Sequence, residues 1–310
     1  MTNQLFKTDP IYSKTMNTKD VQRLFFVINS VSGSNSTDWE AIITEYFTQT
    51  SHIVELFPLV PNTTIKEIKG KLSTFKPDQV IAVGGDGTVK LVAECVVGSK
   101  IVLGILPAGS ANGLARELGI SEDPKLALDI IVDGKNLQIH TTMVNDQLCI
   151  HLSDIGLNAY LMKRFEQSGG RGMWGYFSAS LKVLLQNSPM QLEMHIDDKQ
   201  IKKTAFMVVI ANATMYGTGA LINPIGRLDD DLFEVVIIKK RSLLEVFKMI
   251  FSHEKYDESK TEIFHTNELT IKSRKKVHFQ IDGEYLGKIK EVKAIIKPNS
   301  LIIRTPNKQL

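Results

Sequence analysis

The segment VIAVGGDGTVKLVAE, residues 80–94, decides the fold of this chain. It begins as an apolar strand, breaks at three glycines and resumes as an apolar-periodic helix. Glycine reaches backbone angles closed to other residues and lets a ligand approach the main chain. The free amides of a helix's first turn favour an anion at the same place. The segment therefore predicts a phosphate site or an ordinary tight turn, and it matches neither the P-loop nor the dinucleotide fingerprint.

The aspartate among these glycines, Asp86, is the unexpected residue of the loop. A carboxylate repels a phosphate unless a metal ion, or a group that must lose a proton, lies between the two. Asp-Gly is also a frequent turn pair, which needs no ligand. The loop alone leaves these interpretations open, so the surrounding sequence must decide between them.

Composition restricts the classes of protein to be considered. The chain has 310 residues, of which 43% are hydrophobic, so it can bury a large core, and its length suggests two domains. The net charge of +3 excludes a polycation built for nucleic acid but permits a local basic patch. The two cysteines, Cys95 and Cys149, lack metal or disulfide spacing and indicate a reducing compartment.

No segment has the pattern of a signal peptide or of a membrane-spanning helix. The N-terminal residues MTNQLFKTDPIYS lack an apolar core, and no apolar run approaches the roughly 20 residues that cross a bilayer. We therefore expect a cytoplasmic protein that touches membranes only from their surface.

The first half of the chain alternates apolar strands with amphipathic helices. Residues 1–20 are polar and predict a flexible tail. Helices are expected to begin at Thr37 and Thr64, each with a capping-box glutamate three residues later. Strands are expected at 23–29, 52–59, 78–85 and 100–107, and further helices at 88–96 and 110–118. This alternation predicts a three-layer α/β domain over residues 21–140, with helices on both faces of a parallel sheet.

The second half consists mostly of short alternating strands. Hairpins are expected at 141–152, with an Asn-Asp turn, and at 192–211, with an Asp-Asp turn. Helical patterns interrupt the strands at 158–167, 173–186 and 243–252. Residues 141–310 therefore predict a mostly antiparallel β domain.

Two further loops follow strands of the first half. The residues NSVSG, 29–33, follow the first strand, and LPAGSANGLAREL, 106–118, follows the strand after GGDGT. Loops at the carboxyl ends of parallel strands form the ligand crevice of open α/β sheets. Gly109 can approach a ligand there, while Ser110 and Asn112 can bind a phosphate or cap the helix. For Ser110 a helix cap alone is the competing interpretation.

The ordered set of motifs resembles the diacylglycerol kinase catalytic domain superfamily, in particular the soluble bacterial lipid kinases related to sphingosine kinases. The resemblance runs from about residue 23 to the C-terminus. Its segments are GGDGT (84–88), PAGSAN (107–112), VIANATMYGTG (209–219), GRLDDDLFEVVII (226–238) and QIDGEYLG (280–287). GGDGT alone is shared with the NAD kinases, whereas the ordered set is specific to the lipid kinases.

The resemblance implies a nucleotide-binding α/β domain joined to a β-sandwich, with ATP, Mg²⁺ and a lipid alcohol meeting in the cleft between them. It implies that Glu284 is the catalytic base and that Asp86 holds the catalytic metal, directly or through water. It implies ATP contacts at Asn29, Gly33, Gly84, Gly85, Asp86, Gly87, Thr88 and Ser110, to which the loop reasoning above adds Gly109 and Asn112. It also implies a structural magnesium site at Asp230 with the backbone carbonyls of Arg227 and Leu232. Asp230 as a solvated turn acid, and Asp282-Gly283 as a plain hairpin turn, are the competing interpretations.

Several residues depart from the family pattern, and those other than Ser30 thin the acidic network expected around the metal. Asp86 and Glu284 remain, and Lys90 is expected either to contact phosphate or to lie on a helix surface. The departures are Ser30, Lys90, Leu91, Gly113, His140 and Asn158.

The segment MKRFEQSGGRGMWGYF, residues 162–177, combines basic and aromatic side chains around a glycine hinge. That combination suits an anionic membrane surface. An ordinary helix with a solvated basic face has the same composition.

Three functions stay open at this stage. The first is an ATP-dependent lipid kinase that phosphorylates diacylglycerol or a related lipid alcohol. The second is a catalytically weak lipid- or nucleotide-binding protein of the same fold, and the third is a kinase of a soluble acceptor such as NAD. The retained Glu284 favours the first. The expected partners are a lipid alcohol and an anionic membrane surface but no nucleic acid, and a homodimer is left open.

Overall fold

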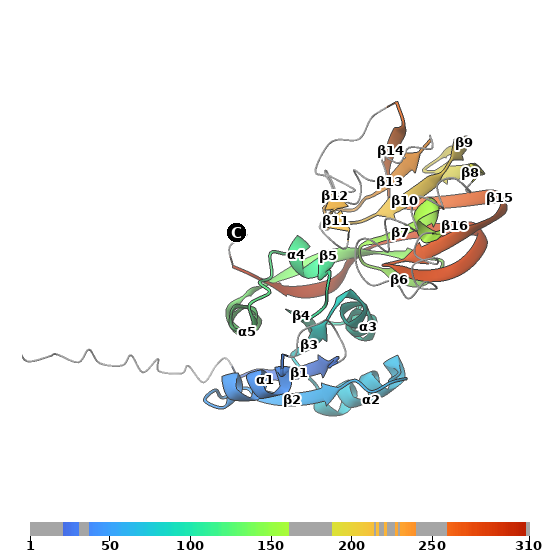
Figure 1. The fold of residues 1–310 in the computed structure, drawn as a ribbon. Helices are drawn as coiled ribbons and strands as arrows, with labels where there is room; N and C mark the ends of the chain where they lie inside the picture. Colours follow the sequence, from blue (N-terminus) through green and yellow to red (C-terminus); the bar gives the residue numbers. More distant parts are fainter. Residues whose placement is uncertain are drawn as a thin grey trace, which may run out of the picture.

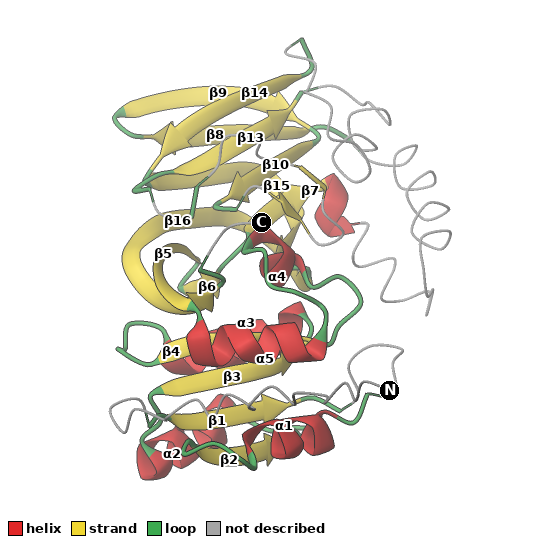
Figure 2. Ribbon diagram, turned by 90° about the vertical axis from the view of Figure 1, so that its left-hand side faces the viewer, coloured by secondary structure: helices red, strands yellow, loops and turns green. Residues whose placement is uncertain are grey.

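The computed structural model describes residues 21–30, 37–160, 188–213, 215–216, 220–221, 227–228, 230–239 and 259–307. Figures 1 and 2 show two regions joined end to end, an α/β region formed by the first half of the chain and an antiparallel β region formed mostly by the second. These two regions confirm the predicted fold class.

The α/β region contains a parallel sheet with the strand order β2-β1-β3-β4. Its strands are β1 (Arg23–Ile28), β2 (Ile53–Pro58), β3 (Gln79–Gly84) and β4 (Val102–Pro107). Its helices are α1 (Trp39–Phe47), α2 (Ile65–Phe75), α3 (Asp86–Val96), α4 (Gly113–Glu117) and α5 (Pro124–Asp133). Each strand lies at its predicted position within one or two residues.

Successive residues of β1 enter two different cores, one on each face of the sheet. Phe25 and Val27 pack with residues of α2 and α3, whereas Leu24 and Phe26 pack with residues of α1 and α5. A strand whose side chains alternate between two buried faces must be apolar throughout. The predicted three-layer arrangement is therefore confirmed.

The helix starts test the capping predictions. Thr64 and Glu67 form the predicted capping box at the start of α2. The predicted cap of α1 at Thr37 is wrong, because the carboxylate of Asp38 accepts the amide hydrogen of Ala41 at 3.0 Å and so begins the helix one residue later. Helix α5 was not predicted, although Asp123 caps it and Pro124 occupies its first turn.

The β region is built from antiparallel pairs. Its strands are β5 (Lys135–Val144), β6 (Gln147–Cys149), β7 (Leu152–Gly156), β8 (Met190–Ile196), β9 (Lys199–Ala205), β10 (Met207–Ala211), β11 (Met215–Tyr216), β12 (Ala220–Leu221), β13 (Phe233–Ile238), β14 (Thr261–Thr266), β15 (Glu268–Ile281) and β16 (Glu284–Thr305). Asn145, Asp146 and Asp197 have positive φ angles at the two predicted hairpin turns. Both hairpins, β5–β6 and β8–β9, are confirmed.

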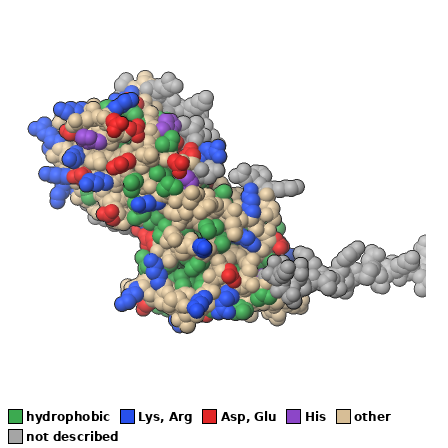
Figure 3. All heavy atoms as spheres, turned by 180° about the vertical axis from the view of Figure 1, so that it is seen from behind, with side chains coloured by type: hydrophobic (Ala, Val, Ile, Leu, Met, Phe, Trp, Pro, Cys, Tyr) green, Lys and Arg blue, Asp and Glu red, His purple; other side chains and the backbone are tan. Residues whose placement is uncertain are grey.

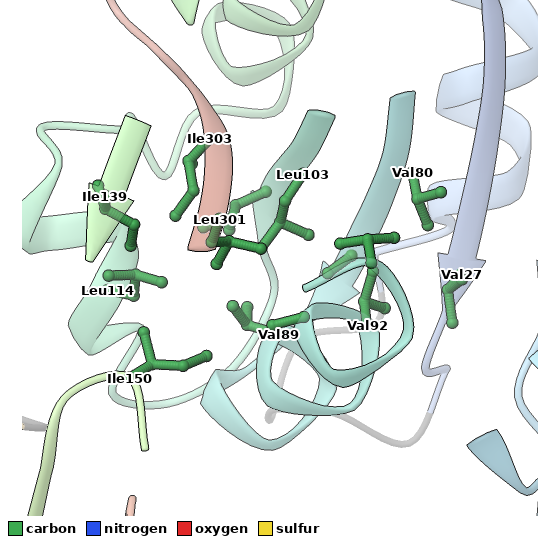
Figure 4. Close-up of a cluster of buried hydrophobic side chains, with 14 of the residues drawn as sticks. Val27, Val80, Val89, Val92, Leu103, Leu114, Ile139, Ile150, Leu301 and Ile303 are labelled. Atoms are coloured by element: carbon green, nitrogen blue, oxygen red, sulfur yellow. The ribbon is translucent and has the colours of Figure 1, made fainter. Parts of the chain in front are cut away.

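Strand β16 joins the two regions into one sheet. Its first part pairs with β15, and its last part lies between β4, in parallel, and β5, antiparallel. Figure 4 shows Leu301 and Ile303 of β16 between Leu103 of β4 and Ile139 of β5. The C-terminal strand therefore completes the core of the first region, while the domain boundary at residue 140 stays a prediction.

Some predicted features lie outside the described residues. These are the tail at 1–20, the helices at 173–186 and 243–252, and most of the helix at 158–167, of which residues up to 160 are described and helical. Within the described part of the chain, none of the helices has the length and apolar character needed to cross a membrane.

We expect Ile303→Ala to destabilise the whole protein, because Ile303 is fully buried in the core that β16 shares with β4 and β5. Loss of a buried isoleucine side chain costs about 2–5 kcal/mol. Urea denaturation followed by circular dichroism measures this free energy of unfolding. Ile295→Ala is the matched control on the same strand, since Ile295 is 42% exposed. Equal effects of the two substitutions would contradict a structural role for the last part of β16, which lies between β4 and β5.

Candidate functional site

Three loops meet at the carboxyl ends of β1, β3 and β4, as predicted. Asn29 follows β1, and its Nδ2 donates to Thr88 Oγ1 of the GGDGT loop at 3.1 Å. The amide of Ala108, after β4, donates to the carbonyl of Gly84 at 3.0 Å. Gly33 of the first loop lies outside the described residues.

The second and third loops touch through glycines. A Cβ atom placed on Gly109 would lie 2.4 Å from the Cα atom of Gly85, far inside van der Waals contact. A Cβ on Gly84 would lie 2.3 Å from Thr88 Oγ1. Gly109 therefore has no room for a side chain because the Gly85 backbone approaches it, and Gly84 has none because the Thr88 side chain fills the space.

Asn112 closes the third loop on itself. It adopts the left-handed conformation, with φ of 51°. Its Oδ1 accepts the amide hydrogen of Gly109 at 2.8 Å, and its Nδ2 donates to the Gly109 carbonyl at 2.9 Å. Asn112, and not Ser110, stands at the N-cap of α4 and makes no side-chain cap bond there. The interpretation of Ser110 as only a helix cap is therefore wrong.

Asp86 supplies the missing cap of α4 from the neighbouring loop. Its two carboxylate oxygens accept the amide hydrogens of Gly113, at 3.1 Å, and Leu114, at 3.2 Å. A carboxylate at a helix N-terminus is stabilised by the unpaired amides and by the helix dipole. This contact is reason enough for an aspartate among the glycines, and it requires no bound ligand. The metal-binding role of Asp86 stays a prediction.

The first turn of α3 is open to an anion. Its N-cap is Gly85, which has no side chain to cap the helix. The next glycine, Gly87, is exposed, and a Cβ there would meet nothing within 4 Å. Because no side chain caps α3 or occupies the space at Gly87, the backbone amides of its first turn can face a phosphate.

The hairpin turn between β15 and β16 is anchored by Asp282. Its carboxylate accepts the amide hydrogens of Ile150 at 3.1 Å, His151 at 2.9 Å and Leu152 at 3.3 Å. Asp282 and Gly283 both have positive φ angles, as a tight Asp-Gly hairpin turn requires. Asp282 is thus a buried anchor, and its interpretation as no more than a turn residue is wrong.

Glu284, the predicted base, lies beside the helix that follows GGDGT. Its Oε2 is 3.3 Å from Nζ of Lys90 on α3, although the two residues are 194 positions apart. The Glu284 side chain is 61% exposed, so a substrate can reach it. The β region therefore folds back onto the GGDGT region, as a base at this position requires, and the catalytic role itself stays a prediction.

The predicted structural magnesium residues lie at the edge of the described segments. Asp230 is half-buried and its Oδ1 accepts the amide hydrogen of Leu232 at 3.4 Å, while Arg227 and Leu232 are exposed. Among the described residues there is no group of three or more His, Cys, Asp or Glu side chains that could hold a metal ion. A magnesium ion here would depend on one carboxylate and backbone carbonyls, which are oxygen ligands of the kind it prefers. This site stays a prediction.

Three of the residues that depart from the family pattern, Gly113, His140 and Asn158, have neighbours that the structure identifies. Gly113 provides one of the amides that Asp86 accepts. His140 is buried, and its Nδ1 lies 3.4 Å from Asp231 Oδ1 without hydrogen-bonding geometry. Asn158 donates from Nδ2 to Asp154 Oδ2 at 2.6 Å.

Asp154 is a buried carboxylate that the sequence analysis did not identify. It also accepts hydrogen bonds from Gln280 Nε2 and from the Ala159 amide. Burial raises the pKa of Asp154 to about 6, and these hydrogen bonds limit the rise. Gln280 Oε1 in turn accepts the Gly283 amide hydrogen at 2.7 Å, which links Asp154 to the turn before Glu284. The signal in the sequence that could have identified Asp154 is an aspartate within a short strand that is otherwise free of charged residues.

Comparison with known proteins identifies both regions. Residues 23–144 match the diacylglycerol kinase catalytic domain, and residues 154–305 match the YegS C-terminal NAD kinase beta sandwich-like domain. The chain belongs to the family of bacterial diacylglycerol kinases and YegS-like lipid kinases. The predicted resemblance is thereby confirmed.

The family assignment is supported by curated relatives. A diacylglycerol kinase of Bacillus subtilis (strain 168) is 26% identical over 218 residues, covering 68% of this chain and 72% of the relative. A diacylglycerol kinase of Mycobacterium tuberculosis is 30% identical over 197 residues, covering 59% of this chain and 64% of the relative.

Two solved structures share the fold of this chain. A putative diacylglycerol kinase from Bacillus anthracis superposes with a TM-score of 0.75 at 16% identity, covering 93% of this chain and 98% of the other. An NAD kinase from Archaeoglobus fulgidus superposes with a TM-score of 0.56 at 12% identity, covering 93% and 95%. At these identities the similarity shows the fold alone.

We expect Asp86→Asn to lower the free energy of unfolding by about 1–2 kcal/mol. The asparagine keeps one acceptor for the α4 amides, but its NH₂ group would face the other amide hydrogen. Thermal and urea denaturation measure the change. Asp38→Asn at the N-cap of α1 is the matched control and should be nearly neutral, because asparagine and aspartate cap equally well. If Asp86→Asn is equally neutral, the carboxylate is not needed to cap α4.

We expect Asp154→Asn to change the pH dependence of stability. Because the folded pKa of Asp154 is raised from 3.8 to about 6, its contribution to stability falls as pH rises through that window. Asparagine does not ionise, so the stability of the variant relative to the wild type should improve by about 2–3 kcal/mol between roughly pH 4 and pH 7.5. Urea denaturation at both pH values measures the two differences, and a pH-independent difference would contradict the raised pKa.

Proposed function

We propose that this protein transfers the γ-phosphate of ATP to the hydroxyl group of a lipid alcohol such as diacylglycerol. One observation carries the proposal: Glu284 of the β region lies 3.3 Å from Lys90 on the helix that begins in GGDGT. A carboxylate that can accept a proton thus stands beside the helix whose N-terminus is the proposed phosphate site. Family membership restricts the chemistry to that of a lipid-kinase-type phosphotransferase.

The three strand-end loops supply the proposed phosphate cradle. Glycines keep side chains away from the backbone where the loops meet, and α3 presents an uncapped N-terminus. Positioning and charge stabilisation account for most of the catalysis of phosphoryl transfer. The proposed ATP contacts are those predicted from the sequence: Asn29, Gly33, Gly84, Gly85, Asp86, Gly87, Thr88, Gly109, Ser110 and Asn112.

Two places in the chain suit magnesium. The Asp86 carboxylate uses two of its roughly four lone-pair sites on amide hydrogens, which leaves capacity for a metal or its water. Asp230, with the carbonyls of Arg227 and Leu232, offers the second oxygen set. Magnesium, when bound, neutralises charge on the phosphates.

Glu284 is the proposed general base. In this role it accepts the proton of the lipid hydroxyl as that oxygen attacks the γ-phosphorus of ATP. Its exposed carboxylate can reach a substrate, while Asp282 fixes the turn that carries it. The backbone anchoring of the turn fixes where the main chain of Glu284 stands relative to α3.

The proposed setting is the surface of an anionic membrane on its cytoplasmic side. Lys202, Lys272 and Arg274 line a groove on β8, β9 and β15, and Figure 3 shows Lys and Arg side chains gathered at that end of the β region. Basic side chains attract anionic headgroups over a Debye length. The aromatic and basic segment 162–177, proposed for the same contact, lies outside the described residues.

We expect Glu284→Gln to reduce phosphate transfer to lipid by about 100-fold or more while leaving ATP affinity within about twofold. Glutamine keeps the size of the side chain but cannot take up a proton. The assay is transfer of labelled γ-phosphate from ATP to a panel of lipid alcohols in mixed micelles, with and without anionic lipid. Calorimetry gives the ATP affinity of the same proteins.

Glu291→Gln, an exposed site on the same strand, is the matched control and should keep full transfer. Full transfer by Glu284→Gln would remove Glu284 from the mechanism. A wild-type protein that binds ATP and lipid without transfer would be the catalytically weak binding protein considered above. Transfer to NAD instead of lipid would make it a kinase of a soluble acceptor.

A further inference from the structure

Lys90 is a lysine in an unusual place. It lies in the second turn of α3, and its side chain is only 8% exposed. Lysine is rarely buried unless its charge is paired, because removing an ammonium group from water is costly. Of the two interpretations of Lys90 from the sequence, the one that puts it on a helix surface is therefore wrong.

Two carboxylates of the β15–β16 turn pair with this ammonium group. Nζ of Lys90 lies 3.3 Å from Glu284 Oε2 and 3.9 Å from Asp282 Oδ2. Asp282 is itself held by three backbone amides and is 7% exposed. Lys90 therefore bridges an anchored carboxylate, Asp282, and a mostly exposed one, Glu284.

A third carboxylate near Lys90, that of Glu94 on α3, does not replace the two carboxylates of the turn as its partners. Glu94 lies one helical turn beyond Lys90, and burial raises its pKa. The raised pKa means that the cost of burying Glu94 exceeds the stabilisation it receives from Lys90. The short contacts of the ammonium group are with the turn.

We infer that Lys90 is the positioning residue of the catalytic base: it holds the Glu284 carboxylate beside α3, the helix that begins in GGDGT. This inference rests on the proposed function. A glutamate that is 61% exposed on a hairpin turn has many accessible rotamers, and an ion pair to a buried ammonium selects among them. A displaced base loses rate even when substrate binding is unchanged.

The proton balance of the step is consistent with this role. The hydroxyl proton passes to Glu284 as the new O–P bond forms and the bond to the leaving ADP breaks. Lys90 keeps its own proton throughout, and Asp282 remains as its counter-ion once Glu284 becomes neutral. Lys90 therefore acts through Glu284 and not as an acid or base.

The test compares Lys90→Met, Lys90→Arg and, as matched control, Lys71→Met on the exposed face of α2. Lys90→Met should lower kcat for lipid phosphorylation about 10–100-fold, with KM for lipid and ATP affinity within about twofold. Lys90→Arg should recover part of the loss because it keeps the charge, and Lys71→Met should match the wild type. Unchanged kcat in Lys90→Met overturns the inference, as does a loss confined to ATP affinity, which would make Lys90 a phosphate-binding residue.

A double substitution separates positioning from an independent effect. If Lys90 acts through Glu284, adding Lys90→Met to Glu284→Gln should lower single-turnover transfer no further. Independent losses that multiply would overturn the inference. Circular dichroism and thermal melting of each variant show whether it is folded.

Failure of the proposed function is recognised separately, because the wild-type protein then transfers phosphate to no lipid alcohol in the panel. The same four proteins, wild type, two single variants and the double variant, then form a double-mutant cycle on the free energy of unfolding. A measurable coupling between Lys90 and Glu284 supports the ion pair that positions the carboxylate. Zero coupling overturns it.

Discussion

The hydrogen bonding of a single strand, β16, is the constraint on which the rest of the structure depends. The strand begins at Glu284 and ends at Thr305, between β4 and β5. Its backbone pairs connect the β15–β16 turn to the parallel sheet without a flexible linker. The position of that turn relative to GGDGT is therefore set by sheet pairing and core packing. Two residues separated by 194 positions, Lys90 and Glu284, come into contact for this reason.

The three strand-end loops behave as one unit because each is bound to its neighbour. Asn29 donates to Thr88, the backbones of Gly85 and Gly109 touch, and Asp86 caps α4. A site that recognises phosphate through backbone amides must keep side chains away, which deprives its helices of local caps. The carboxylate in GGDGT resolves this conflict by capping the helix of the adjacent loop while α3 remains open.

Three charged side chains on or linked to the β15–β16 turn are buried, and the cost of burying each is offset in a different way. Asp282 is solvated by three backbone amides, Lys90 is paired with two carboxylates, and Asp154 responds through a pKa raised to about 6. Buried ionisable groups with specific partners are typical of functional sites. Hydrogen bonds link Asp154 through Gln280 to the turn before Glu284, so the candidate site includes residues that do not themselves contact Glu284 or Lys90.

The sequence by itself determined most of the strands and helices of the α/β region, though not α5 or the cap of α1, together with the parallel sheet, both hairpins and the edge at which the loops gather. Such features are encoded within a few consecutive residues, by apolar periodicity, turn dipeptides and capping boxes. It did not determine that Asp86 would cap α4, that Asp282 would be an anchor, or that Lys90 would be buried against Glu284. Only the tertiary structure decided these contacts, because each joins segments far apart in the chain, and a local pattern carries no information about which distant backbone amide or charge will lie within 3–4 Å.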